Sequence, residues 1–357
     1  MQSLLARLNK YSGATTAIIS ILLGMVVGAI MMLAAGYNPV AAYNALFVSA
    51  LFQPYDLGET IRTITPLILT GLAVAIAFRT GLFNIGVEGQ FIVGQLVAFI
   101  VATQLGLPPV IQVIVAVIMG GLAGALWGLV PGFLKASRGV HEVIVSIMMN
   151  FIALYLSNYL IRTWLAKGAD STPKIADSPP LKVDVLSQIF GGSRIHLGIF
   201  IALLGVFVMY YLLYRTKLGY ELRAVGYNPR ASEYAGMSVK RNIILSMMIS
   251  GSFAGLAGAS EVLGTSGYLS IEAAFTGIGF DGIAVALLGG NTPLGVIFAA
   301  SLFGVLNYGG GNMQFEADVP FEVIRVVVAA IILFVAANIS TKIVGRFRKQ
   351  KGVKKHG

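Results

Sequence analysis

The 357-residue sequence contains no cysteine and little charge. Without cysteine, the chain has no disulfide, no thiol nucleophile and no thiolate metal ligand. Charged residues make up only 11% of the chain, whereas hydrophobic residues make up 57% and the mean hydropathy is +0.83. This balance excludes both a soluble globular domain and a disordered chain. The three histidines, His141, His196 and His356, are too dispersed to suggest a metal site.

The sequence also lacks the motifs of the common enzyme classes. No P-loop of the form GxxxxGK[ST] occurs, so the chain cannot bind and hydrolyse ATP through the usual phosphate cradle. A GxGxxG match begins at Gly277, but it lies in an apolar run without the strand-turn-helix context of a dinucleotide site. No paired carboxylates, nucleophile elbow or HExxH motif appears. We therefore predict a protein that is not an enzyme, has no cofactor of its own, and takes any ATP energy from a partner.

Long apolar runs dominate what is present. Their continuous hydrophobicity predicts an all-α, polytopic transmembrane bundle, because the strands of a transmembrane barrel would alternate apolar and polar residues. We predict a single transmembrane domain over residues 1–357 with about ten spans, at 14–35, 60–78, 85–105, 110–134, 143–161, 196–214, 242–264, 275–290, 293–310 and 321–340. Residues 39–52 are too short and interrupted to span, so they are predicted as an interfacial or re-entrant helix before Pro54.

The distribution of basic residues predicts the orientation of the chain. With both termini in the cytoplasm, 18 of the 25 Lys and Arg residues fall on inside segments, as the positive-inside rule requires. Seven of them form a basic cytoplasmic tail at 342–357, which accounts for much of the net charge of +10 without a nucleic-acid partner. Residues 162–195 become an external loop and residues 215–241 a cytoplasmic loop. We expect a multi-pass protein of the bacterial plasma membrane.

Glycines are regularly spaced in the predicted span 110–134. Gly120, Gly124, Gly128 and Gly132 recur every four residues and so lie on one face of a helix. Small residues let two helix backbones approach closely, and we predict that this face packs against another helix.

The stretch Arg79 to Gln95 places polar groups and glycines between two apolar runs. An ionisable group at membrane depth faces protein or water, so Glu88 is a candidate functional residue. We predict that the solute pathway includes polar and aromatic side chains from this stretch and one from a neighbouring span: Phe83, Asn84, Glu88, Gln90 and Asn150. The alternative is that these groups bind one another between helices and never contact solute. Glu261, Glu272 and Asp281 lie near predicted membrane ends and are given no role.

The cytoplasmic loop contains more than a connection requires. Turn residues at Gly226 and Asn228 precede Pro229, a favoured first helical residue, and a short amphipathic helix is predicted to end at Gly236. We predict that this segment docks into a groove of a cytoplasmic protein, through Gly226, Asn228, Arg230, Tyr234, Ala235 and Gly236. The alternative is a surface helix that lies on lipid headgroups.

Three stretches carry a family resemblance: TGLFNIGVEGQ at residues 80–90, HEVIVSIMMN at 141–150 and VGYNPRASEYAGMSV at 225–239. With the ten-span pattern, they resemble permease subunits of bacterial ABC importers of the ribose and branched-chain amino acid type, most closely the longer of two permeases in nucleoside importers. The resemblance implies a heterodimer with a second permease, cytoplasmic ATPase subunits that bind ATP, and an extracellular solute-binding lipoprotein. It also implies a nucleoside substrate and a coupling helix at about residues 228–236.

Other transport functions remain open. Related permeases serve sugars and amino acids on similar scaffolds, so a ribose-type or amino acid importer is an alternative. An ion-coupled secondary transporter would need several buried carboxylates or unwound helix ends, for which only Glu88 and Asp281 qualify. A channel would need a repeated selectivity ring, and the sequence has none.

Overall fold

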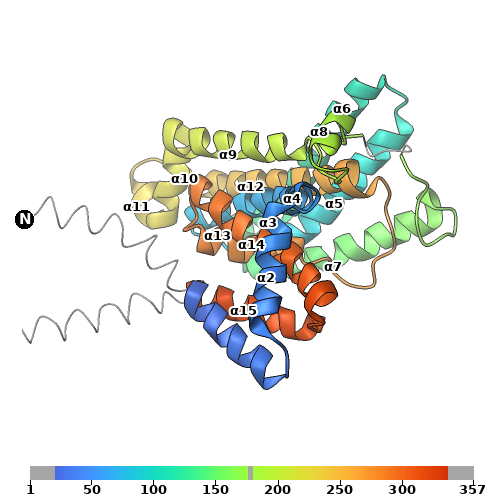
Figure 1. Cartoon of the computed structure of the whole chain (residues 1–357). Coiled ribbons are helices and arrows are strands. Elements are labelled where there is room, and N and C mark those ends of the chain that lie inside the picture. Colours follow the sequence, from blue (N-terminus) through green and yellow to red (C-terminus); the bar gives the residue numbers. More distant parts are fainter. Residues whose placement is uncertain (1–20, 176–179, 337–357) are drawn as a thin grey trace, which may run out of the picture. The chain divides into compact units, whose positions relative to one another are not determined.

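The computed structural model describes residues 21–175 and 180–336, and every regular element in these ranges is a helix (Figure 1). The extended pairings within them are two isolated bridges, Ser171 with Ser270 and Lys182 with His196. The predicted all-α fold is confirmed. The start of the first predicted span and the basic tail at 342–357 lie outside the described residues.

Contacts divide the chain into two compact units, residues 53–304 and residues 1–52 with 305–357. The larger unit contains most of the helices: α4 (Pro54–Arg79), α5 (Val87–Gln104), α6 (Pro109–Arg138), α7 (Glu142–Leu160) with the π-helical turn η2 (Ile161–Leu165), α8 (Asp184–Ile189), α9 (Gly198–Arg215), α10 (Lys217–Tyr227), α11 (Pro229–Tyr234), α12 (Val239–Glu261) with η3 (Val262–Ser266), α13 (Ile278–Leu288) and the start of α14 (Pro293–Ala317).

The smaller unit joins the two ends of the described chain. It contains a helix at Ile21–Ala34, α2 (Pro39–Asn44), η1 (Ala45–Ser49), α3 (Ala50–Phe52), the end of α14 and α15 (Phe321–Ala336). The predicted helix at 39–52 is present as the consecutive segments α2, η1 and α3. It begins where the Asn38 side chain accepts a hydrogen bond from the Val40 amide at 3.0 Å, with Pro39 as the first helical residue.

Within residues 21–175 and 180–336, seven helices are long and apolar enough to cross a membrane: Pro54–Arg79, Val87–Gln104, Pro109–Arg138, Glu142–Leu165, Gly198–Arg215, Val239–Ser266 and Pro293–Ala317. Each coincides with a predicted span. The helix predicted from residue 60 begins earlier, at Pro54, because proline is well tolerated at the first position and the polar residues that follow are still helical. Of the other predicted spans, 275–290 forms a helix of only 11 residues, α13.

Helix α12 is central in the larger unit and packs against α4, α5 and α6. The contact with α6 is made by glycine on both sides: a Cβ added to Gly124 would collide with the Gly251 carbonyl, and one added to Gly255 would collide with the Gly120 carbonyl. On the α5 side, a Cβ on Gly94 would collide with the Gly255 backbone. The predicted packing face is confirmed, and it holds α5, α6 and α12 together through their backbones.

Helix α13 packs against α4 through small residues. A Cβ on Gly71 of α4 would lie 2.7 Å from the Val285 side chain, and one on Gly282 of α13 would lie 2.6 Å from the Thr70 hydroxyl. Helix α13 is short, and about 11 irregular residues connect it to η3. Irregular backbone at membrane depth is tolerated where it is buried in protein or lines a cavity.

Candidate functional site

The chain is not helical between the end of α4 at Arg79 and the start of α5 at Val87. This break brings Asn84 beside Gln90: the Asn84 Nδ2 atom donates to Gln90 Oε1 at 2.9 Å and to Ser250 Oγ at 2.7 Å. On a continuous helix Asn84 and Gln90 would point in different directions. The helix break that the glycine-rich sequence suggested is present, and it joins these two amides in a buried network.

Glu88 lies in the first turn of α5 and is fully buried. Its carboxylate accepts hydrogen bonds from the Thr276 hydroxyl at 2.9 Å, the Gly277 amide at 2.9 Å and the Gly279 amide at 2.6 Å. Gly277 and Gly279 are at the N-terminus of α13, where unpaired amides and the helix dipole favour an anion. Glu88 therefore caps α13 and fixes its position against α5.

Asn150 of α7 forms hydrogen bonds with the backbone around the start of α5. Its Oδ1 atom accepts from the Gly89 amide at 2.8 Å, and its Nδ2 atom donates to the Ile85 carbonyl at 3.0 Å. Phe83 instead stacks on Phe78, with ring centroids 5.3 Å apart. The structure thus brings together four of the five predicted pathway residues, and in this conformation their polar groups are bonded to the protein.

A cavity of about 280 Å³ lies next to this network. It is bounded by α5, α7, η2, the end of α12, and the irregular segment 266–278. Its lining includes Phe91, Tyr268 and a set of polar side chains: Gln95, Ser157, Asn158, Glu261, Ser266, Ser270, Glu272 and Thr276. Thr276 is shared, since it lines the cavity and donates to Glu88. Sequence reasoning gave Glu261 and Glu272 no role, because only the fold brings the end of α12 and the connection before α13 to one cavity.

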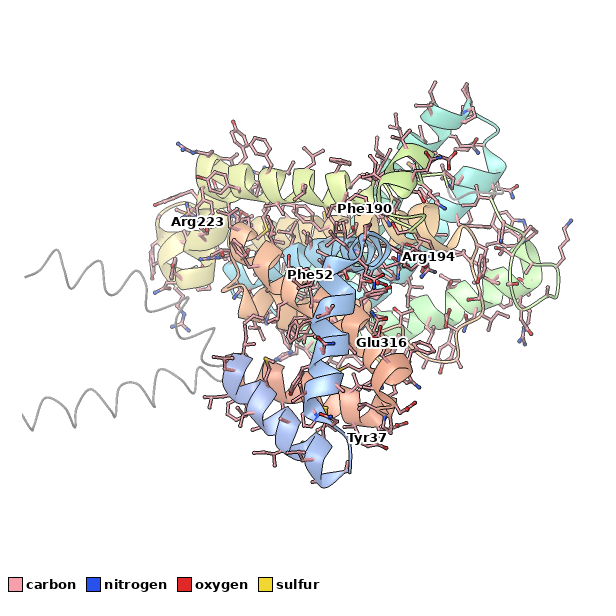
Figure 2. The ribbon with its side chains drawn as sticks, viewed as in Figure 1. Tyr37, Phe52, Phe190, Arg194, Arg223 and Glu316 are labelled. Atoms are coloured by element: carbon pink, nitrogen blue, oxygen red, sulfur yellow. The ribbon has the colours of Figure 1, made fainter. Side chains whose placement is uncertain are left out.

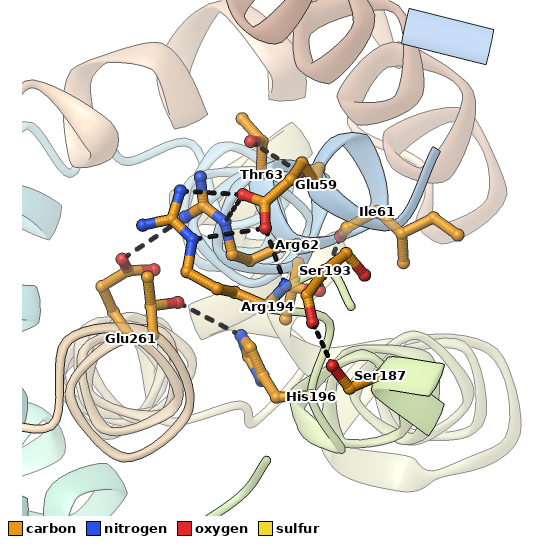
Figure 3. Close-up of polar contacts among 11 residues, drawn as sticks. Glu59, Ile61, Arg62, Thr63, Ser187, Ser193, Arg194, His196 and Glu261 are labelled. Carbon is orange, nitrogen blue, oxygen red and sulfur yellow. Dashed lines mark hydrogen bonds and ion pairs between the residues drawn. The ribbon is translucent and has the colours of Figure 1, made fainter. Parts of the chain in front are cut away.

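An ionic cluster surrounds the buried Glu59 (Figure 3) and reaches Glu261, which lines the cavity. Glu59 of α4 is 1% exposed and accepts from Arg62 Nε at 2.8 Å and Arg194 Nη2 at 2.9 Å, while Arg62 Nη1 lies 3.9 Å from Glu261. The hydrogen bonds that Arg194 donates to Glu59 raise the pKa of Arg194. The cluster therefore ties the end of the 162–195 loop to α4 and α12. The pairing of Glu59 with Arg62, three residues apart at the start of a span, is a sequence signal that could have located it.

His196 lies beside this cluster and is 1% exposed (Figure 3). Its Nδ1 atom accepts from the Gly198 amide at 3.1 Å, and its Nε2 atom lies 3.4 Å from the Thr265 hydroxyl. Burial, together with the positive charge of Arg62, lowers the pKa of His196 to about 4. The imidazole is therefore neutral at physiological pH.

The 215–241 loop is more ordered than a simple connection. Helix α10 occupies Lys217–Tyr227, and α11 begins at Pro229, where the Asn228 side chain accepts from the Ala231 amide at 3.0 Å. The predicted short helix is confirmed: α11 ends before Gly236, whose φ of +80° suits glycine. The side chains of Arg230, Tyr234 and Ala235 are exposed, Tyr234 by 95%. The helix thus presents its small apolar face outward.

The same loop touches the break between α4 and α5. A Cβ added to Gly226 at the end of α10 would collide with the Arg79 carbonyl, and an added Gly81 Cβ would lie 3.3 Å from Gly226 Cα. Arg79 also donates from Nε to the Asn291 carbonyl at 2.8 Å, beside a cavity of about 180 Å³ that Arg223 helps to line. Arg223 lies near one end of the larger unit, well apart from Arg194 in the view of Figure 2.

The chain also matches a protein family and several known proteins in sequence. Residues 57–336 match the family model described as branched-chain amino acid transport system, permease component. The chain is 52% identical to the guanosine ABC transporter permease protein NupP of Bacillus subtilis, over 96% of this chain and 99% of NupP. It is 41% identical to the nucleoside ABC transporter permease protein NupB of Lactococcus lactis, over 92% of each chain.

More distant relatives include permeases of other systems and a second permease of the guanosine system. The glucose ABC transporter permease protein TsgB13 of Haloferax volcanii is 34% identical over 90% of this chain and 87% of its own. The guanosine ABC transporter permease protein NupQ of Bacillus subtilis is 28% identical over 73% of this chain and 84% of its own. No solved structure matches the chain significantly.

Proposed function

Because the chain belongs to the branched-chain amino acid transport system permease family, we propose that it is the membrane-spanning subunit of an ATP-driven nucleoside importer. The observation that carries this proposal is its identity with the guanosine permease over nearly the full length of both chains. Identity with the glucose permease is lower, so a sugar importer is the second candidate and an amino acid importer the third.

The proposed complex contains this chain, a second permease, cytoplasmic ATPase subunits and an extracellular solute-binding lipoprotein. Two permeases of one guanosine system, NupP and NupQ, are both relatives of this chain, which supports a heterodimer. ATP would be bound by the partner ATPases, because the sequence has no P-loop. We propose about ten spans in the plasma membrane with both termini in the cytoplasm, of which the shorter ones include α13.

We propose that α11 is the coupling helix, docking into an ATPase subunit. Its support is the exposed face of Tyr234 and Ala235 and the contact that Gly226 makes with the end of α4. A shift of α10 and α11 would press on Arg79 and Gly81, directly before the helix break at Asn84. Movement at the ATPase would reach the break through backbone contacts.

We further propose that Asn84, Glu88, Gln90 and Asn150, with Phe83, line the inner part of the solute path. The hydrogen bonds between Glu88 and the N-terminus of α13 close this part in the present conformation. If α13 moves away from α5, these bonds open and the buried amides and carboxylate become available to a solute with hydroxyls and ring nitrogens.

Uptake of radiolabelled guanosine into vesicles that contain the co-purified complex tests the function. We expect uptake to require ATP on the cytoplasmic side and to continue when ionophores dissipate the ion gradients. Loss of uptake with the ionophores would indicate a secondary transporter. ATP-dependent uptake of glucose or leucine in place of guanosine would support the second or third candidate instead.

A further inference from the structure

The cavity beside Glu88 has the composition of a binding site for a small polar solute. Its volume of about 280 Å³ is close to the lower end of the range for small-molecule pockets, roughly 300–1,000 Å³. Tyr268, which is 38% exposed, gives it aromatic surface. Hydroxyl, amide and carboxylate groups line the rest.

Several of these polar groups have unused hydrogen-bonding capacity. Among the described residues, the buried Ser266 Oγ atom has no hydrogen-bond partner. Glu272 is exposed, and its Oε1 atom accepts from the Ser270 hydroxyl at 2.9 Å. A buried polar atom without a partner is costly, and a bound solute can satisfy it.

The segment that supplies Tyr268 and Glu272 is held in place by main-chain bonds. Asn158 of α7 donates to the Glu272 carbonyl at 2.8 Å and accepts from the Glu272 amide at 3.1 Å. On the other side, the Thr172 amide donates to the Leu269 carbonyl at 2.9 Å. The irregular segment is therefore fixed at both sides, and the cavity walls are positioned before a solute arrives.

The charge of the lining restricts what can bind. Two carboxylates, Glu261 and Glu272, line the cavity, and its described lining contains neither lysine nor arginine. Outside the lining, Arg62 Nη1 lies 3.9 Å from Glu261 Oε1. Carboxylates accept strong hydrogen bonds from hydroxyl and N–H donors but repel a second anion. The lining thus suits an uncharged solute that carries donors and a flat ring.

We propose that this cavity binds an uncharged nucleoside and rejects nucleotides. Glu272 and Glu261 accept hydrogen bonds from the hydroxyls or base N–H groups of the solute, and Tyr268 stacks on its base. A nucleotide is excluded because its phosphate would lie beside two carboxylates. This inference rests on the proposed nucleoside import. It places the bound solute in the cavity beside Glu88 and not at the Glu88 carboxylate itself.

The natural absence of cysteine allows a direct test. Ala274 lines the cavity and is exposed, so Ala274→Cys places one thiol there with no background labelling. Thr103→Cys, at the exposed outer end of α5, is the matched control. Each variant is assembled into the complete complex and treated with methanethiosulfonate reagents of either charge, with and without guanosine or guanosine 5′-monophosphate.

We expect guanosine to slow the labelling of Ala274→Cys several-fold and the monophosphate to leave it unchanged. The cationic reagent should react faster than the anionic one at Ala274→Cys but not at Thr103→Cys, and adding Glu272→Gln should weaken this preference. Neither nucleoside nor nucleotide should affect Thr103→Cys. Absence of protection by guanosine in a complex that imports guanosine would overturn the proposal.

Uptake kinetics give a second measurement. Glu272→Gln and Tyr268→Ala should each raise the KM for guanosine about tenfold with little change in the maximal rate, because each removes a contact with the solute. Tyr268→Phe should retain the wild-type KM, and Asp184→Asn, an exposed carboxylate outside the cavity, is the control. If wild-type complex imports no guanosine, the proposed function fails, and the labelling experiment still decides separately whether the cavity binds a nucleoside.

Discussion

The carboxylate of Glu88 has three hydrogen-bond donors and no contact with solvent. Replacing Glu88 by Gln puts an amide NH₂ group against backbone N–H donors, so at least one donor loses its acceptor. We expect a loss of stability of about 1–3 kcal/mol, seen as a lower Tm in detergent, together with slower uptake. Glu322→Gln, an exposed carboxylate in the first turn of α15, should leave both unchanged.

The two single variants Glu88→Gln and Asn84→Ala test the solute path. If both single variants remain folded and show wild-type uptake rate and substrate preference, these residues do not line the path. The capping role of Glu88 would survive that result, because it depends only on the stability measurement.

His196 predicts a pH dependence of stability. Its pKa is lowered to about 4 in the folded protein, against an ordinary value of 6.5, so protonation favours the unfolded chain. The stabilisation is complete above pH 6.5 and is lost as the pH falls from 6.5 to about 4, by roughly 3 kcal/mol at about 1.4 kcal/mol per unit.

The measurement is the Tm of the purified protein between pH 7.5 and 4. His196→Asn removes the titrating group while keeping a side-chain acceptor, and it should flatten the profile in this range. An equally steep profile in His196→Asn would assign the pH dependence to other groups.

At the scale of the helix, the glycine contacts of α6 predict a sharp response to added volume. Gly124→Leu forces a side chain into the α12 backbone, and overpacking typically costs about 1–3 kcal/mol. We expect a lower Tm before any change in substrate preference. Gly311 of α14 is the matched control, since a Cβ there meets nothing within 4 Å, so Gly311→Leu should be tolerated. A fully stable Gly124→Leu protein would contradict the close packing.

The exposed face of α11 predicts a separation of folding from transport. Ala235→Glu places a charge on an apolar surface that is exposed in the isolated chain, so the amount of protein in the membrane should stay near normal. In the complex the same charge would enter a groove without a partner, and uptake and ATPase association should both fall. Normal uptake with normal ATPase association would contradict the docking role of α11.

Elements with a strong local signal were predictable from the sequence, and those set by tertiary contacts were not. The apolar runs located the seven long helices, and Asn228, Pro229 and Gly236 defined α11 because caps act within a few residues. The start of α4 was misplaced by its polar first turns, and α10 was missed because its amphipathic sequence lies within a charged loop.

The candidate site shows the same limit. Glu88 was recognised as an unusual charge, but its partners are one hydroxyl and two backbone amides 188 to 191 residues away, which no local pattern identifies. Glu272 was set aside because it lies near a predicted membrane end. Its place in the cavity depends on how segment 266–278 folds back against α7.

At the scale of the whole molecule, the proposed orientation can be tested on the cysteine-free chain. Asp184→Cys in α8 and Tyr234→Cys in α11 place single thiols at exposed positions in the two loops. A membrane-impermeant maleimide should label Asp184→Cys in intact cells and Tyr234→Cys only after the cells are permeabilised. The reverse pattern would invert the proposed orientation, and labelling of both in intact cells would place the loops on one side.

The glycine contacts among α5, α6 and α12 also determine which parts of the molecule can exchange amide hydrogen with water. Helices that meet backbone to backbone leave no room for water, so their amides should open only with global unfolding and remain protected for the longest times. The segment 267–277, which precedes α13, is irregular instead. Its amides should exchange earlier, which would make hydrogen exchange a direct record of where this part of the molecule opens.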